Sequence, residues 1–201
     1  MQRNAQQLSA EDLREAGIKS LQNASELVEE AQLLFEHGRW SRAAFLCCIS
    51  GEELGKCFMS LSAVVNRKAG RFDENRYKRR FRTHQEKTGL LHFFEDIFVS
   101  SSDVPARVSD IDGQTQLTEK VKLAALYCDF YGVRPCAPSE LITEQLASGA
   151  LKLAKNRVKH FTEQIRPMFD RALQIDPAEI MPFLREFLRS MGVDVESDAD
   201  S

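Results

Sequence analysis

Hydrophobic residues recur along this chain at steps of three and four, the spacing that places them on one face of an α-helix. The first such segment covers about residues 10–37, where Ser9 can cap the start and Gly38 ends the pattern. No segment alternates for long with the two-residue period of a strand, and no turn dipeptide lies between strand-like runs. The pattern therefore predicts an all-α protein without a sheet.

Five further helices follow from the same spacing and from the signals for helix starts and ends. Their predicted ranges are about 41–68, 74–98, 116–130, 139–166 and 176–192. Asp73 and Ser139 are placed to cap the third and fifth helices, and Pro167 is expected to bend or break the fifth. Pro177 suits the first turn of the last helix. Because the connections are mostly short, we expect an antiparallel bundle of about six helices.

Length and composition fit one domain. The chain has 201 residues, 43% of them hydrophobic, which is enough for one core and too few to expect two. We expect a helical domain over residues 1–192 and a disordered acidic tail over 193–201, because the last eight residues hold four acids and no base. The N-terminus lacks the apolar run of a signal peptide, and no apolar run can span a bilayer. We therefore expect a cytoplasmic protein without a membrane partner.

The second predicted helix contains an unusual segment, GEELGK, at residues 51–56. The flanking residues are apolar on two sides of the helical wheel, so we expect this helix to pack on two sides. Glycine inside a helix costs about 1 kcal/mol relative to alanine. Gly51 and Gly55, one turn apart, therefore indicate that a neighbouring backbone comes close.

The charges of this segment are expected to be partly buried, and an unpaired buried carboxylate is costly. Glu52 and Lys56 have the spacing of an ion pair along a helix, and Glu53 flanks the main apolar stripe. One interpretation is an internal ion-pair network that fixes helix packing. The other is a polar cleft in which these acids position basic groups of the next helix.

The third predicted helix is strongly basic. Residues 71–87 hold seven lysines and arginines against three acids. Five of its side chains share one face of the wheel, namely Arg76, Arg80, Thr83, His84 and Lys87. A histidine flanked by arginines suits proton transfer beside a phosphate near neutral pH. The same pattern also fits a solvated basic face that pairs with acids elsewhere.

Motifs for metal or nucleotide chemistry are missing from the sequence. There is no His-Glu-x-x-His, no glycine-rich phosphate loop and no nucleophile elbow. The five cysteines are an odd number without Cys-x-x-Cys spacing. We therefore expect no metal site and no cofactor.

Three segments, EELGK, FRTHQEK and ALYCDF, resemble those of the AbiV-type abortive-infection proteins of the HEPN superfamily. The resemblance spans about residues 10–166 and implies an all-helical, HEPN-like bundle. HEPN ribonucleases carry an arginine, four to six residues, and then a histidine. Arg79 and His84, with four residues between them, match that spacing.

The resemblance implies a metal-independent endoribonuclease of phage defence. The ribose 2′-OH would attack the adjacent phosphate, with His84 assisting proton transfer and Arg79 stabilising the phosphate charge. Supporting or binding roles are assigned to Glu52, Glu53, Lys56, Arg76, Arg80 and Lys87. RNA as substrate, a homodimer that joins two motifs at one cleft, and a phage-encoded protein as trigger are also expected. The alternative is a non-catalytic helical module that binds RNA, a nucleotide or a protein partner.

Overall fold

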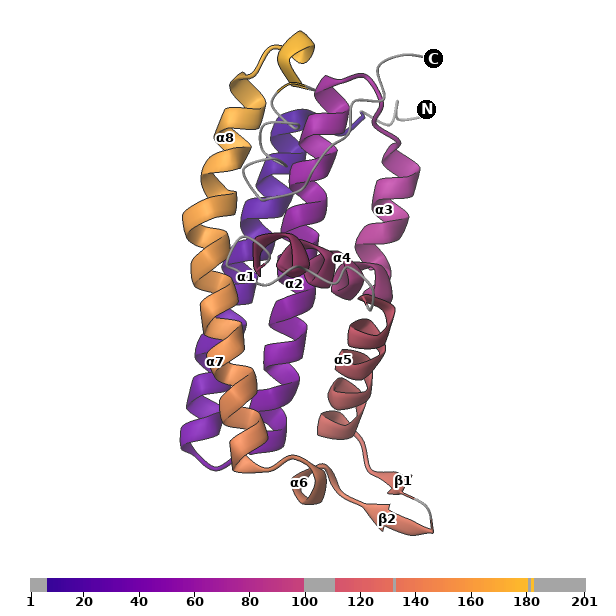
Figure 1. Ribbon diagram of the computed structural model, residues 1–201, viewed down its shortest axis with the longest axis vertical. Helices are drawn as coiled ribbons and strands as arrows, with labels where there is room; N and C mark the ends of the chain where they lie inside the picture. The colour runs from indigo at the N-terminus through magenta and orange to yellow at the C-terminus, as the bar shows by residue number, and fades with distance from the viewer. Residues whose placement is uncertain (1–6, 100–110, 132, 181, 183–201) are drawn as a thin grey trace, which may run out of the picture.

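The computed structural model describes residues 7–99, 111–131, 133–180 and 182. They form an elongated helical bundle, which confirms the predicted all-α class (Figure 1). Two long antiparallel helices, α1 (Ala10–Glu36) and α2 (Trp40–Lys68), run along it. The predicted acidic tail lies outside the described residues. No described helix is long and apolar enough to span a membrane.

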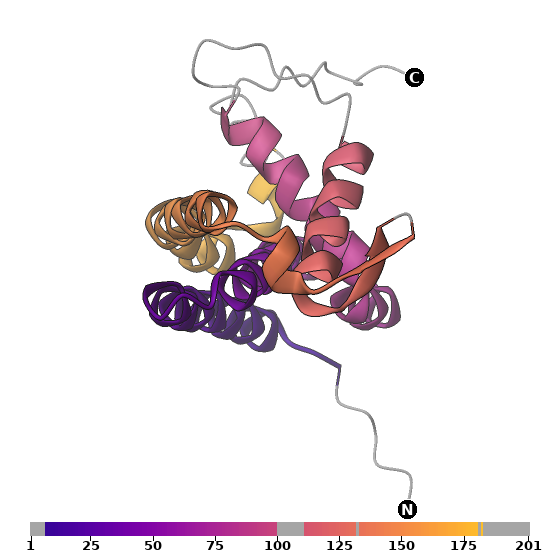
Figure 2. The same ribbon diagram turned by 90° about the horizontal axis from the view of Figure 1, so that it is seen from below.

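Helix α2 is the centre of the bundle, and more than half of its residues are buried. It contacts α1 and a continuous rod made of α7 (Glu144–His160), the π-helical turn η2 (Phe161–Ile165) and α8 (Arg166–Gln174). It also contacts α4 (His84–Val99) and α5 (Ile111–Leu126). Figure 2 shows the rod and the α4–α5 pair on different sides of the bundle. The packing of α2 on two sides is therefore as its wheel predicts.

The predicted N-caps of the first and third helices are confirmed. The Asp12 amide donates to Ser9 Oγ at 3.0 Å, and the Ser9 amide donates to Asp12 Oδ2 at 2.8 Å, which completes a capping box. The Arg76 amide donates to Asp73 Oδ1 at 2.9 Å. Gly38, with φ of +71°, ends α1 as expected, since glycine adopts this left-handed conformation without strain.

The prediction of a single helix over residues 74–98 is wrong. The chain breaks at Thr83 into α3 (Glu74–Arg82) and α4. Thr83 has an extended backbone with φ of −85° and ψ of 119°, and its hydroxyl donates to the Arg79 carbonyl at 3.1 Å. No proline or glycine marks this break, so local sequence did not reveal it. Packing of α4 against α2 fixes it instead.

The prediction of no sheet is also wrong. Strands β1 (Asp129–Tyr131) and β2 (Arg134–Cys136) form a small antiparallel hairpin, in which Asp129 lies opposite Cys136 (Figure 1). Helix α5 ends at Leu126, before the predicted end of the fourth helix at residue 130. Strands of three residues are too short for their alternation to be recognised in the sequence.

The fifth helix begins and ends elsewhere than predicted. A short helix, α6 (Pro138–Leu141), covers Ser139, and Thr143 caps α7 by accepting from the Leu146 amide at 3.2 Å. Pro167 does not end the rod, because it lies in the first turn of α8 after the wide π turn. A 3₁₀ turn, η3 (Pro177–Glu179), follows, and most of the predicted last helix lies outside the described residues.

The close approach predicted from the glycines of α2 is present at Gly55. A Cβ added there would lie 2.1 Å from the Lys87 carbonyl oxygen, so only glycine lets the backbone of α4 pack at this distance. At Gly51 the neighbour is a side chain, because an added Cβ would lie 3.0 Å from Leu91 Cδ2. Gly55 therefore sets how near α4 comes to α2.

Replacing Gly55 with alanine is expected to lower the free energy of unfolding by about 2 kcal/mol, because the methyl group must push the α4 backbone away. Gly149→Ala is the matched control, since Gly149 lies in exposed helix with nothing within 4 Å of an added Cβ. It is expected to raise stability by up to about 1 kcal/mol. Urea unfolding of both variants tests this, and a Gly55→Ala protein as stable as the wild type would contradict the close packing.

Candidate functional site

A buried carboxylate in the middle of α2, that of Glu52, gathers three basic side chains. His84 Nδ1 lies 2.5 Å from Glu52 Oε2, and Lys122 Nζ lies 2.7 Å from Oε1. Lys87 Nζ is 3.3 Å from Oε2. Only 4% of Glu52 is exposed, so water screens these contacts little.

The partners of Glu52 come from two different helices. His84 and Lys87 lie in the first turn of α4, and Lys122 lies in α5. Lys122 also pairs with Glu119 of its own helix at 2.7 Å. Two carboxylates thus face two buried lysines, so the lysine charges are balanced without a charge on His84.

Both members of the Glu52–Lys122 pair are held in their ionised forms. Burial alone raises the pKa of Glu52, but hydrogen bonds from Lys122 and His84 outweigh it and hold that pKa below its ordinary value. Burial alone lowers the pKa of Lys122, but the Glu119 and Glu52 carboxylates outweigh it and raise that pKa. The pair therefore stays charged at neutral pH.

His84 joins this buried cluster to the surface. Its side chain is 64% exposed although its Nδ1 contacts the buried carboxylate. An ionised Glu52 accepts a hydrogen bond, so Nδ1 carries the proton, and Nε2 is the nitrogen that can exchange a proton with a bound molecule. Within the described part of the chain, no hydrogen bond occupies Nε2. The arrangement is that of an oriented general acid or base.

The predicted ion pair between Glu52 and Lys56 is wrong. Lys56 Nζ instead lies 2.5 Å from Glu53 Oε1 and 5.3 Å from the centroid of the Phe81 ring. The reason is tertiary, because α4 and α5 supply the partners of Glu52. Glu53 and Lys56 form a separate pair beside the Glu52 cluster.

The predicted basic face of one continuous helix is also wrong. The break at Thr83 separates it, so that Arg76 and Arg80 stay on α3 while Lys87 turns inward on α4. Lys87 is 3% exposed and faces Glu52. It therefore belongs to the buried cluster and presents no charge to solvent.

The two candidate arginines differ in their surroundings. Arg79 is exposed on α3, and its carbonyl accepts a hydrogen bond from the Thr83 hydroxyl. Arg80 Nε donates to Glu86 and so forms an ion pair that joins α3 to α4 across the break. Among the described residues, no hydrogen bond or ion pair links either guanidinium to His84.

Lys122 is the site residue that the sequence analysis missed. It lies three residues before the fully buried Ala125, on the face of α5 that packs inward. A lysine on the buried face of a helix indicates a carboxylate partner on a neighbouring element, so the sequence contained a signal for this residue. Its partner, Glu52, is 70 residues away in the chain, so the sequence alone did not pair them.

The fold and the site define an all-α bundle protein in which a buried carboxylate orients an exposed histidine at a helix break. Residues 12–159, well over half of the chain, match the model of the HEPN family described as AbiV. The chain belongs to this AbiV family, and the expected family and fold are confirmed. No curated protein and no solved structure matches the chain.

Replacing Glu52 with glutamine is expected to lower the free energy of unfolding by about 3 kcal/mol at pH 7, because it leaves two buried lysines short of a partner. The folded-state pKa of Glu52 lies below the unfolded value of about 4.3. Its contribution is therefore complete above that value and is lost as the pH falls through the folded pKa. The difference between variant and wild type should therefore shrink as the pH falls below about 4.3.

Urea unfolding at several pH values measures this difference, with Glu29→Gln as the control. Glu29 is exposed on α1, and its loss is expected to change stability by less than about 0.5 kcal/mol at any pH. A destabilisation by Glu52→Gln that stays constant from pH 7 to pH 3 would argue against an ionised Glu52 in the folded protein.

Proposed function

We propose that this AbiV-family protein is a metal-independent endoribonuclease that acts in phage defence. The observation that carries the proposal is the hydrogen bond between buried Glu52 and exposed His84. Catalysis by a general base needs an imidazole in one tautomer, with its reactive nitrogen open to the substrate. Glu52 supplies the first condition, and the exposure of His84 supplies the second.

The reaction uses the ribose of RNA as its own nucleophile. His84 Nε2 takes the proton of a 2′-OH while that oxygen forms a bond to the adjacent phosphorus. The bond from phosphorus to the 5′ oxygen breaks, and that oxygen receives a proton from the imidazolium or from water. The products are a 2′,3′-cyclic phosphate and a 5′-hydroxyl, so no metal or other co-reactant is consumed.

Arg79 is the proposed stabiliser of the charge on the phosphorane. It has the family spacing to His84, and its exposed position on α3 leaves its guanidinium accessible to RNA. Arg80 is assigned a supporting role, because its pair with Glu86 holds α3 and α4 together beside His84. Glu53 and Lys56 keep only a structural role in this proposal.

The second candidate is a non-catalytic module that binds RNA, a nucleotide or a protein partner. It is favoured by the arginines of α3, two of which line a pocket to which His84 does not contribute. The homodimer, the phage-encoded trigger and the cytoplasmic location implied by the family stay predictions.

Purified protein is expected to cut total cellular RNA in EDTA into discrete fragments with 2′,3′-cyclic phosphate ends. His84→Ala should lower the rate at least about 100-fold, because it removes the general base. Arg79→Ala should lower it by a similar factor, because it leaves the phosphorane charge uncompensated. His37→Ala is the control, since His37 is an exposed histidine at the end of α1 and should keep full activity.

The pattern of activity separates the two candidates. Equal cleavage by wild type and His84→Ala would contradict the assigned base. RNA left intact by every variant, but bound by the protein, would favour the binding module.

A further inference from the structure

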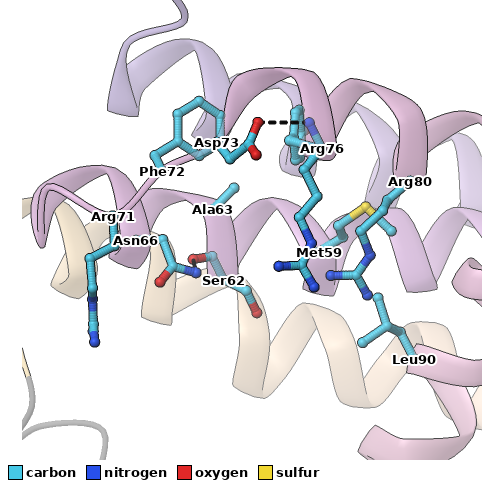
Figure 3. Close-up of a pocket in the computed structure, with 11 residues that line it drawn as sticks. Met59, Ser62, Ala63, Asn66, Arg71, Phe72, Asp73, Arg76, Arg80 and Leu90 are labelled. Carbon is cyan, nitrogen blue, oxygen red and sulfur yellow. Dashed lines mark hydrogen bonds between the residues drawn. The ribbon is translucent and has the colours of Figure 1, made fainter.

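A second feature of the molecule is a pocket of about 300 Å³ between α2 and the α3 segment. Three arginines line it, Arg71 just before α3 and Arg76 and Arg80 within it. Figure 3 shows the side chains of Arg76 and Arg80 extending from α3 in the same direction, toward Met59 and Leu90. His84 and Glu52 are not among its lining residues, so the pocket is separate from the candidate active site.

The two arginines that α3 contributes to this pocket, Arg76 and Arg80, keep donor atoms that no acid of the described residues occupies. Among the described residues, Asp73 is the one acid that lines it, and its carboxylate accepts from the backbone amide of Arg76 as the cap of α3. Arg80 uses Nε for Glu86, which leaves its terminal nitrogens available as donors. Within the described residues, the Arg76 guanidinium makes no ion pair. Two arginines one helical turn apart repel each other unless an anion lies between them.

The shape of the pocket fits a phosphate that carries an organic group. Guanidinium groups match the oxygens of phosphate through paired hydrogen bonds. Ser62 and Asn66 of α2 add polar atoms to one wall, while Met59 and Leu90 provide apolar surface on which a sugar or base can rest. The volume is at the lower end of that of small-molecule sites, which is more than a bare phosphate needs.

We propose that this arginine pocket binds a phosphate group of RNA and holds the strand beside the Glu52–His84 site. The inference rests on RNA being the partner, as the proposed function has it, but not on cleavage. Arg80 lines the pocket and pairs with Glu86, two residues after His84, so an ion pair connects the pocket to the first turn of α4. A strand held at Arg76 can therefore follow α3 toward His84.

The test measures binding of a fluorescent single-stranded RNA of twelve nucleotides by anisotropy. The full chain carries His84→Ala so that the RNA stays intact. Arg71→Gln and Arg76→Gln are compared with Arg82→Gln, which removes the same charge from an exposed position about 9 Å further along the helix axis. Thermal melting confirms that each variant is folded.

Arg76→Gln and Arg71→Gln are each expected to raise Kd at least tenfold, and Arg82→Gln less than threefold. Loss of one phosphate contact should also reduce the slope of log K against log salt by about 0.7. RNAs with a 5′-phosphate and with a 5′-hydroxyl distinguish the source of the bound group. If the affinity for both RNAs depends on Arg76, the bound group is an internal phosphodiester. If only the affinity for the phosphorylated RNA depends on Arg76, the bound group is the terminal phosphate.

Two results would contradict phosphate binding in the arginine pocket. One is an equal change of Kd in Arg76→Gln and Arg82→Gln for both RNAs, and the other is a His84→Ala parent protein that binds neither RNA. The cleavage assay on protein that retains His84 keeps the two proposals apart. If the protein cleaves RNA but Arg76→Gln has no specific effect on binding, only the proposal of RNA binding in the arginine pocket is rejected. Binding that needs Arg76, without cleavage, rejects the catalytic proposal alone.

Discussion

The arrangement of α2, α4 and α5 depends on one buried carboxylate. A lone ionised carboxylate in the interior would cost several kcal/mol, so Glu52 requires cationic partners from neighbouring helices. They come from α4 and α5, and each contact ties one of those helices to α2. Gly55 makes this possible by removing the side chain that would otherwise hold the Lys87 backbone away. The charge cluster and the close backbone contact are therefore parts of one packing solution.

The same cluster carries the proposed chemistry. Buried ion pairs are seldom more stabilising than well-packed apolar side chains, so their value lies in fixing positions. Here the fixed position is that of His84, whose ring is anchored at Nδ1 and exposed elsewhere. Lys122 holds Glu52 ionised, and Lys87 and Lys122 both fix its position, which makes them positioning residues in the proposed mechanism. Stability and the proposed proton transfer are thus linked through the side chain of Glu52.

The helix break at Thr83 divides one basic segment into two kinds of surface. Arginines before the break stay on α3, where they face solvent or the arginine pocket. After the break, Lys87 points into the interior, and His84 lies between the buried Glu52 and the solvent. A continuous helix would have placed Arg76, Arg80, His84 and Lys87 on one face. The break therefore leaves the arginine pocket on α3 and the anchored histidine at the start of α4.

The sequence by itself determined the all-α class, the family, the caps of α1 and α3, and the role of Gly55, because these follow from local periodicity, local hydrogen bonds and short motifs. It also marked Glu52 as a charge in need of a partner and His84 as a candidate general base. Only the tertiary structure decided which partners they have. The pairing of Glu52 with His84 and Lys122, the break at Thr83 and the inward turn of Lys87 all arise from contacts between residues far apart in the chain. Such contacts depend on how three helices share the space around one buried charge, and no local pattern encodes that.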